Sequence, residues 1–165
     1  MTVRDAEKNW MTVGSFVHYF PSHKPYEVGI ISSIQKGRVR VVYQCDGDWM
    51  NFHKYGGQRT TNTDLVARWP PQAFRLNGLS EEFANYNGLR IVPHVGLCGI
   101  RPMIFTHGLF YGLDSSGAMG RYCFKDSVDA EASLLMWNGE ESPGTAWIKH
   151  SKTLGGEERN PNFEQ

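Results

Sequence analysis

The chain has 165 residues, 40% of them hydrophobic and 21% charged, so it can form one domain or two small ones, and this composition argues against disorder over most of its length. Its formal net charge is zero, which counts against nucleic-acid binding because nucleic-acid-binding proteins usually carry a basic excess. The three cysteines do not resemble a disulfide framework, and no apolar run approaches the roughly 20 residues that a membrane helix needs. The N-terminus lacks the apolar core of a signal peptide, so we expect a cytoplasmic protein, although a virion component would share these features.

After a polar N-terminal tail over residues 1–12, residues 13–69 have the pattern of a compact all-β unit. The expected strands are GSFVHYF, YEVGIISSI and RVRVVYQC. The third of these alternates clearly, with arginines on one side and, on the other, Val39, Val41 and Tyr43. The Asp46-Gly47 pair that follows is a strong turn signal.

Three aromatic residues follow this turn at intervals of three: Trp49, Phe52 and Tyr55. This spacing does not fit a strand, whose side chains alternate every two residues. It favours an irregular or one-turn helical segment that brings several rings to one side. The rings either fill the interior of a small barrel or lie partly at the surface, and the spacing alone leaves both interpretations open.

The pattern over residues 13–69 resembles the small SH3-like and Tudor-like β-barrels. The matching features are a glycine-led first strand, a Glu27-x-Gly29-x-Ile31 second strand, a valine-rich third strand ending in Tyr43, and a return containing Trp49 before Asp64-Leu65. The resemblance implies a small closed barrel. It also implies binding of peptides, methylated side chains or nucleic acid through an aromatic face, or binding of a neighbouring domain.

Trp69-Pro70-Pro71 is the expected boundary to a second unit over residues 72–150. GLFYGLDSSGAMGRYCF predicts a β-hairpin, because apolar residues alternate on both sides of a Ser-Ser-Gly turn. KDSVDAEASLLMWNG predicts a helix with Asp126 or Ser127 as its cap, Gly139 as its stop, and a buried face of Ala130, Leu134 and Trp137. The fold class is therefore mainly β with an α+β second half, in which the helix packs across the hairpin, and residues 151–165 form a polar tail. This half resembles uncharacterised small bacterial and phage proteins with a similar hairpin and helix.

Candidate reactive groups are sparse. His94, Cys98, His107 and Cys123 lack the close pairs typical of a zinc site, so we expect no metal and no cofactor. Cys98 lies in a glycine-flanked loop that could expose a thiol, with His94 or His107 as a base. A small cysteine-dependent enzyme is therefore an alternative function.

An aromatic–basic set of side chains in the first unit is the expected binding surface: Tyr19, Arg38, Arg40, Trp49, Phe52, Tyr55 and Arg59. Rings and arginines together are typical of protein interfaces and of single-stranded nucleic-acid sites. We expect a non-catalytic accessory or interaction protein of phage or mobile-element type that acts by protein–protein binding. A nucleic-acid-binding module is a further alternative, no membrane association is expected, and a homodimer stays open.

Overall fold

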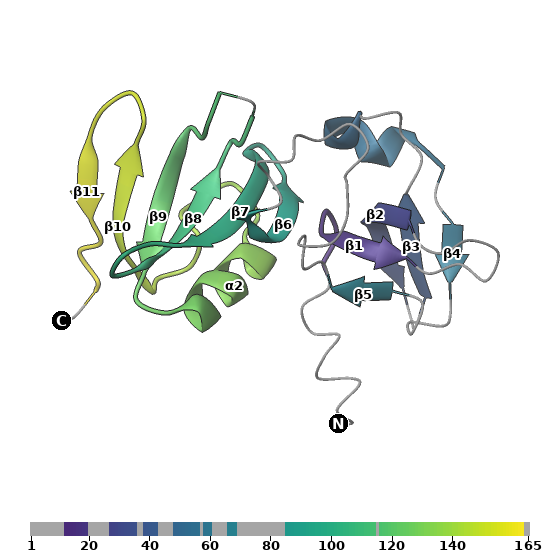
Figure 1. The fold of residues 1–165 in the computed structure, drawn as a ribbon, viewed down its shortest axis with the longest axis horizontal. Coiled ribbons are helices and arrows are strands. Elements are labelled where there is room, and N and C mark those ends of the chain that lie inside the picture. The colour runs from purple at the N-terminus through teal and green to yellow at the C-terminus, as the bar shows by residue number, and fades with distance from the viewer. Residues whose placement is uncertain are drawn as a thin grey trace. The chain divides into compact units, whose positions relative to one another are not determined.

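The computed structural model describes residues 12–19, 27–35, 38–42, 48–56, 58–60, 66–68, 85–114 and 116–163. The chain divides into two compact units, Met1–Ala84 and Asn85–Gln165, each with its own antiparallel sheet (Figure 1). The second unit begins at Asn85, later than the boundary expected at the two prolines. That boundary and nearly all of the expected N-terminal tail lie outside the described residues.

The sheet of unit 1 has five strands in the order β4-β3-β2-β1-β5. Their bounds are Phe16–Tyr19 (β1), Glu27–Gln35 (β2), Arg38–Val42 (β3), Gln58–Thr60 (β4) and Val66–Arg68 (β5). Within the described ranges of unit 1 the two ends of this sheet, β4 and β5, do not pair with each other, so a closed barrel is not confirmed and stays a prediction. The buried side chains of the sheet include Phe16, Val17, Ile30, Ile31 and Val41.

Strand β3 has the predicted alternation over Val39, Arg40 and Val41, although Val42 is buried as well. Val39 and Val41 are buried, whereas Arg40 between them is half-exposed. The β2–β3 ladder contains a register shift between Ile31 and Ser33. Tyr43 and the predicted Asp46-Gly47 turn lie outside the described residues.

The sheet of unit 2 is a meander of six strands in which every strand pairs with the next one in sequence, in the order β11-β10-β9-β8-β7-β6. The strands are Asn87–Val92 (β6), Gly96–Pro102 (β7), His107–Tyr111 (β8), Gly120–Phe124 (β9), Trp147–Lys152 (β10) and Glu157–Arg159 (β11). The predicted hairpin is confirmed as β8 and β9, with Leu109 opposite Tyr122 and Tyr111 opposite Gly120.

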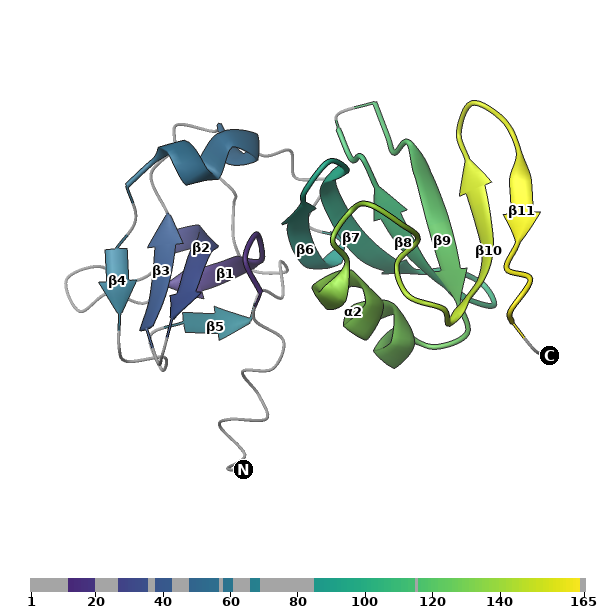
Figure 2. The same cartoon turned by 180° about the vertical axis from the view of Figure 1, so that it is seen from behind.

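Helix α2, Ser127–Met136, lies on one face of this sheet and contacts strands β6 to β9 (Figure 2). Asp126 is its N-cap, as predicted: the carboxylate accepts a hydrogen bond of 2.9 Å from the Asp129 backbone N–H. The predicted buried face is also confirmed, with Ala130, Leu134 and Trp137 all under 10% exposed. The helix ends at Met136, and its C-cap Trp137 lies two residues before the glycine expected to stop it.

The end of the chain differs from the polar tail expected over residues 151–165. It contains the last residues of β10, a turn and the edge strand β11. Beyond β11, the buried side-chain amide of Asn160 donates hydrogen bonds of 2.8 Å to the carbonyls of Thr145 and Trp147. These bonds join the segment after β11 to the start of β10 and the residues just before it. The three charged residues of β11 show no apolar alternation, so sequence periodicity could not reveal the strand.

Candidate functional site

The aromatic segment of unit 1 forms a 3-10 helix, η2, Trp49–Lys54, in agreement with the predicted helical turn. Phe52 is buried, which places this ring in the core and corrects its expected role at a binding surface. Tyr55 is half-buried, and its hydroxyl donates a 2.9 Å hydrogen bond to Asp48. Asp48 also accepts a 2.8 Å bond from the Asn51 amide, and these two bonds, that of Asn51 first, lower the pKa of the Asp48 carboxyl.

The basic residues of unit 1 come from neighbouring strands. Arg40 of β3 stands directly opposite Arg59 of β4, and Arg38 begins β3 two residues earlier. Like charges directly opposite in an antiparallel pair destabilise it unless an anion or another partner compensates them. Tyr19 lies at the end of β1 and Trp49 at the start of η2, but their side chains and those of two of the arginines, Arg38 and Arg59, lie outside the described ones. The aromatic–basic surface stays a prediction.

Cys98 is fully buried on β7, within the apolar core beneath α2. Its thiol donates a 3.4 Å hydrogen bond to the Gly96 carbonyl, and burial raises its pKa to about 12. A catalytic cysteine needs the opposite environment, one that is accessible and stabilises the thiolate. His94 is exposed in the β6–β7 turn and His107 is half-buried on β8, and neither histidine hydrogen-bonds Cys98. The structure thus offers no support for the cysteine-dependent alternative.

A hydrogen-bonded cluster on the helix-side face of the unit 2 sheet was missed by sequence reasoning. We call it the His150 cluster, and it comprises Tyr111, Tyr122, Trp137, Trp147, His150 and Glu158. The His150 ring is 5% exposed and stacks on Tyr122, with a centroid distance of 4.0 Å and an interplanar angle of 7°. Its Nε2 lies 2.7 Å from the Tyr111 hydroxyl, and its Nδ1 lies 3.0 Å from Oε1 of Glu158.

The order of these bonds fixes where the protons lie in the neutral ring. The Glu158 carboxylate can only accept, so Nδ1 of His150 donates to it. Nε2 of the neutral imidazole then accepts, and the Tyr111 hydroxyl donates to it. Burial is the main cause that raises the pKa of Tyr111, and the negative charge of Glu158 is the second. The phenol therefore keeps its proton. With a neutral His150, the two hydrogen bonds therefore run in one direction: Tyr111 donates to His150, and His150 donates to Glu158.

Gly120 makes room for this arrangement. It stands opposite Tyr111 in the β8–β9 ladder, and a Cβ at position 120 would collide with the Tyr111 hydroxyl and approach the Ser151 carbonyl oxygen to 2.8 Å. The tyrosine side chain can cross strand β9 and reach His150 on β10 only because residue 120 has no side chain. The GLFYG and GRYC segments predict the hairpin that holds Tyr111 and Gly120, but they give no sign of His150.

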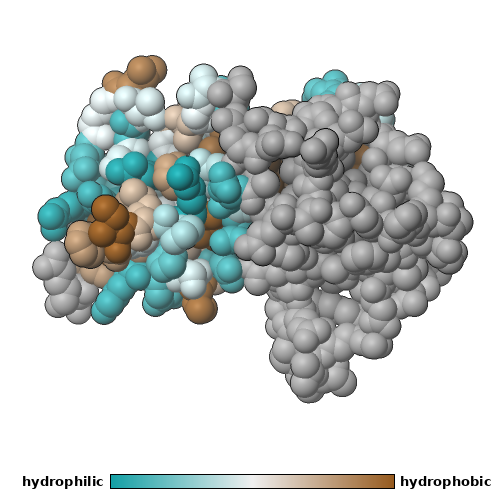
Figure 3. Space-filling model, in the orientation of Figure 1, coloured by the Kyte–Doolittle hydropathy of each residue, from teal (hydrophilic) through white to brown (hydrophobic). Residues whose placement is uncertain are grey.

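Beside Tyr111, the loop between β8 and β9 and the loop between β10 and β11 enclose a cleft of about 570 Å³. The cleft is lined by Tyr111, Gly112, Asp114, Ser116, Gly117, Ala118, Met119, Lys152, Thr153, Leu154 and Gly155. The two loops are joined by Thr153, whose hydroxyl and backbone N–H donate to the carbonyls of Ala118 and Met119. Figure 3 shows the tip of the β10–β11 loop, at the upper left, coloured hydrophobic, in agreement with the full exposure of Leu154.

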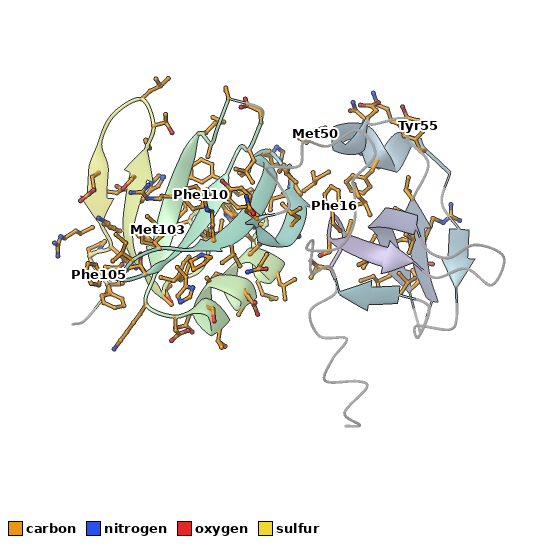
Figure 4. The ribbon with its side chains drawn as sticks, in the orientation of Figure 1. Phe16, Met50, Tyr55, Met103, Phe105 and Phe110 are labelled. Carbon is orange, nitrogen blue, oxygen red and sulfur yellow. The ribbon has the colours of Figure 1, made fainter. Side chains whose placement is uncertain are left out.

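At the connection between β7 and β8, two large apolar side chains point into solvent. Ile104 is 89% exposed and Phe105 is 92% exposed. The backbone N–H of Met103 donates a 2.8 Å bond to the Thr106 carbonyl and closes the turn beneath them. Figure 4 shows Phe105 at the end of this connection, apart from Phe110 on the sheet. We refer to Ile104 and Phe105 as the apolar tip.

No protein-family model matches the chain, and neither a curated protein nor a solved structure matches it. In the described part of the chain, no three histidine, cysteine, aspartate or glutamate side chains are grouped so that they could hold a metal ion. The same residues include no helix long and apolar enough to cross a membrane.

Proposed function

We propose that this chain is a non-catalytic interaction protein that binds a protein partner through the apolar tip of unit 2. The observation that carries the proposal is the pairing of Ile104 and Phe105, both about 90% exposed, at the end of one hairpin. A single exposed apolar residue is ordinary, but two adjacent ones project a larger apolar surface. Burying a side chain of this size is worth roughly 1.5–3 kcal/mol, so the pair can form the centre of an interface.

The hairpin holds the tip in place before any partner arrives. Arg101 pairs with Gly108 and Pro102 pairs with His107 directly below the turn. A preformed turn loses little conformational entropy on binding, which favours affinity. A protein partner is preferred over a lipid surface because two side chains bury too little apolar area to hold a protein at a bilayer, where even a single myristoyl chain binds only marginally.

For unit 1 we propose an SH3-like barrel that supplies a second contact. The support is its strand order, in which β1 lies between β2 and β5 and the remaining strands follow in sequence. Arg40 and Arg59, opposite each other in the β3–β4 ladder, favour an acidic partner surface there. Exposed Met50 and half-exposed Tyr55 belong to the same unit (Figure 4).

The test compares three tagged forms of the full chain: wild type, the double variant Ile104→Ser/Phe105→Ser, and Met136→Ser. Met136 is 83% exposed on α2, so its substitution removes a similar apolar side chain away from the tip. Each form is incubated with nuclease-treated host lysate, and bound proteins are quantified by mass spectrometry. We expect one or more proteins to bind wild type and Met136→Ser and to be lost at least about tenfold from the tip variant, which corresponds to about 1.4 kcal/mol.

Equal recovery with the tip variant would remove the apolar tip from the proposal. A partner that is recovered from a parallel untreated lysate but not from the nuclease-treated one would instead favour nucleic acid as the ligand. Thermal unfolding of the three forms serves as the folding control, because substitutions of exposed residues should change stability by less than about 0.5 kcal/mol. Size-exclusion chromatography with light scattering shows whether the bound protein is a second copy of the chain.

A further inference from the structure

The face of the unit 2 sheet opposite α2 combines arginines with aromatic rings. Side chains alternate along a strand, so the neighbours of Leu109 and Tyr122, which belong to the core beneath α2, lie on this opposite face. These neighbours are Phe110 and Arg121, which stand directly opposite each other in the β8–β9 ladder. Figure 2 shows α2 in front of the sheet, so Figure 1 views the sheet from the arginine side.

The register of the ladders brings further basic residues to the same face. Four basic side chains lie there, one from each of β7, β9, β10 and β11: Arg101, Arg121, Lys149 and Arg159. We call these four residues and Phe110 the arginine face. We infer that the arginine face binds single-stranded nucleic acid, with phosphates on its basic groups and bases against its guanidinium groups and rings. This inference concerns a different surface from the apolar tip and does not depend on it.

The arginine face is basic although the whole chain is neutral. Within the described strands, its acidic side chain is Glu157, whose Oε2 lies 3.6 Å from Nζ of Lys149. Among the described residues, the three arginines of the face form no ion pair. A local excess of positive charge attracts anions whatever the total charge, so the zero net charge does not count against an anionic ligand here.

Two of the arginines are held against aromatic rings. Cζ of Arg121 lies 6.0 Å from the centre of the Phe110 ring, and Cζ of Arg101 lies 5.7 Å from that of Tyr86. The two rings meet edge to face, with centroids 5.6 Å apart. Gly108 leaves room for this layer, because a Cβ at position 108 would come within 2.7 Å of the Phe110 ring. The guanidinium groups are therefore positioned by the protein before a ligand binds.

Arg121 presents the outer end of its guanidinium group to solvent. Its Nε is buried and has no acceptor among the described residues, whereas its terminal nitrogens are neither buried nor hydrogen-bonded there. A planar group fixed in this way can bind a phosphate through two parallel hydrogen bonds. Unstacked bases also stack on guanidinium planes as they do on aromatic rings.

The extent of the basic row indicates the kind of ligand. From β7 to β11 the row crosses four strand spacings, about 19 Å, so a single phosphate cannot contact all of it. An acidic peptide would use the charges but not the layer of rings and guanidinium groups. A single nucleic-acid strand uses both, because its base planes are accessible, whereas those of a duplex are stacked within the helix.

The test measures binding of the purified full chain to a fluorescein-labelled single-stranded oligoadenylate of about 12 nucleotides, by fluorescence anisotropy at several salt concentrations. Each phosphate contact of a single strand contributes about −0.7 to the slope of log K against log salt. Three or four contacts therefore predict a slope of about −2 to −3. Between about 50 and 200 mM salt, the affinity should fall roughly 20- to 50-fold.

Arg121→Gln removes one contact and should reduce the magnitude of the slope by about 0.7 while it weakens binding. Arg159→Gln, on the exposed edge strand β11, is a second variant with the same expected effect. The matched control is Lys152→Gln, because Lys152 pairs with Gly120 on the other face of the sheet, and it should leave the slope unchanged. Arg121→Lys should keep the slope but weaken binding, since lysine keeps the charge and loses the planar fork.

Thermal unfolding shows that each variant is folded before its affinity is compared. No binding at about 50 mM salt, or a slope near zero, would overturn the inference. So would an equal loss of affinity in Lys152→Gln and Arg121→Gln. A glutamate peptide of the same length that competes as well as the oligoadenylate would assign the face to an acidic protein instead. Equal affinity for the duplex of oligoadenylate with oligouridylate would show that the bases are not recognised, which also contradicts the inference.

Discussion

On the face of the unit 2 sheet that packs against α2, strands β6 to β9 differ from strands β10 and β11 in the side chains they carry. Strands β6 to β9 bury apolar side chains such as Ile100, Leu109 and Phe124 beneath α2. Farther along the sheet, β10 and β11 contribute His150 and Glu158 to a hydrogen-bonded cluster whose Tyr111 also lines an open cleft. The covered half owes its stability to the area it removes from water, whereas the open half depends on the direction of a few bonds. We therefore expect substitutions in the two halves to lower the free energy of unfolding by different amounts.

The largest effect is expected in the covered half. Phe124→Ala removes a ring with no solvent exposure from the core and leaves a cavity, so the free energy of unfolding should fall by about 3–5 kcal/mol. Chemical denaturation monitored by circular dichroism measures this loss. Val128→Ala on the exposed side of α2 is the control and should change stability by less than about 0.5 kcal/mol. A loss of unfolding free energy below about 1 kcal/mol for Phe124→Ala would mean that the helix does not exclude water from this part of the core.

A smaller effect is expected at the border of the open half. Gly120→Ala introduces a methyl group against the Tyr111 hydroxyl and the Ser151 carbonyl, and we expect a loss of about 1–3 kcal/mol. In a Tyr111→Ala background the same substitution should cost less, because one of the colliding groups is gone. A double-mutant cycle measures this coupling. Strictly additive losses would contradict the crossing of β9 by Tyr111.

Alkaline pH should also destabilise unit 2, through Cys98 on β7 and Tyr122 on β9. Burial raises the pKa of Cys98 from 9.0 to about 12, and burial together with the neighbouring charges raises that of Tyr122 from 10.0 to about 12. The unfolded chain loses these protons at lower pH than the folded chain. The stability that both groups contribute is therefore complete below pH 9 and is lost as the pH rises toward 12.

Thermal unfolding between pH 8 and pH 11 tests this linkage, and we expect Tm to fall progressively above pH 9. In Cys98→Ala the fall should begin nearer pH 10, the ordinary pKa of a tyrosine. A Tm that stays constant up to pH 11 would show that neither proton is held by the fold.

Local patterns predicted the covered half well and the open half poorly. Alternation in GLFYG and GRYC predicted the β8–β9 hairpin, and the aspartate before SVDAEASLLM predicted the N-cap of α2, because these signals involve neighbours in sequence. His150 owes its role to Tyr111, 39 residues away, and to Glu158 on a strand of three charged residues without periodicity. In unit 1 the spacing of the rings predicted the turn of η2 but not which ring is buried, and Phe52 lies in the core.

The meander of unit 2 also has a consequence for the order of assembly. Since each strand pairs with its sequence neighbour, the sheet can grow hairpin by hairpin as the chain leaves the ribosome, without waiting for distant partners. Glu158 lies on β11, the last of the six strands in sequence, so the carboxylate that orients His150 is synthesised after the residues of the other five strands. In a nascent chain that ends before β11, the other five strands can pair, but no Glu158 carboxylate selects the tautomer of His150.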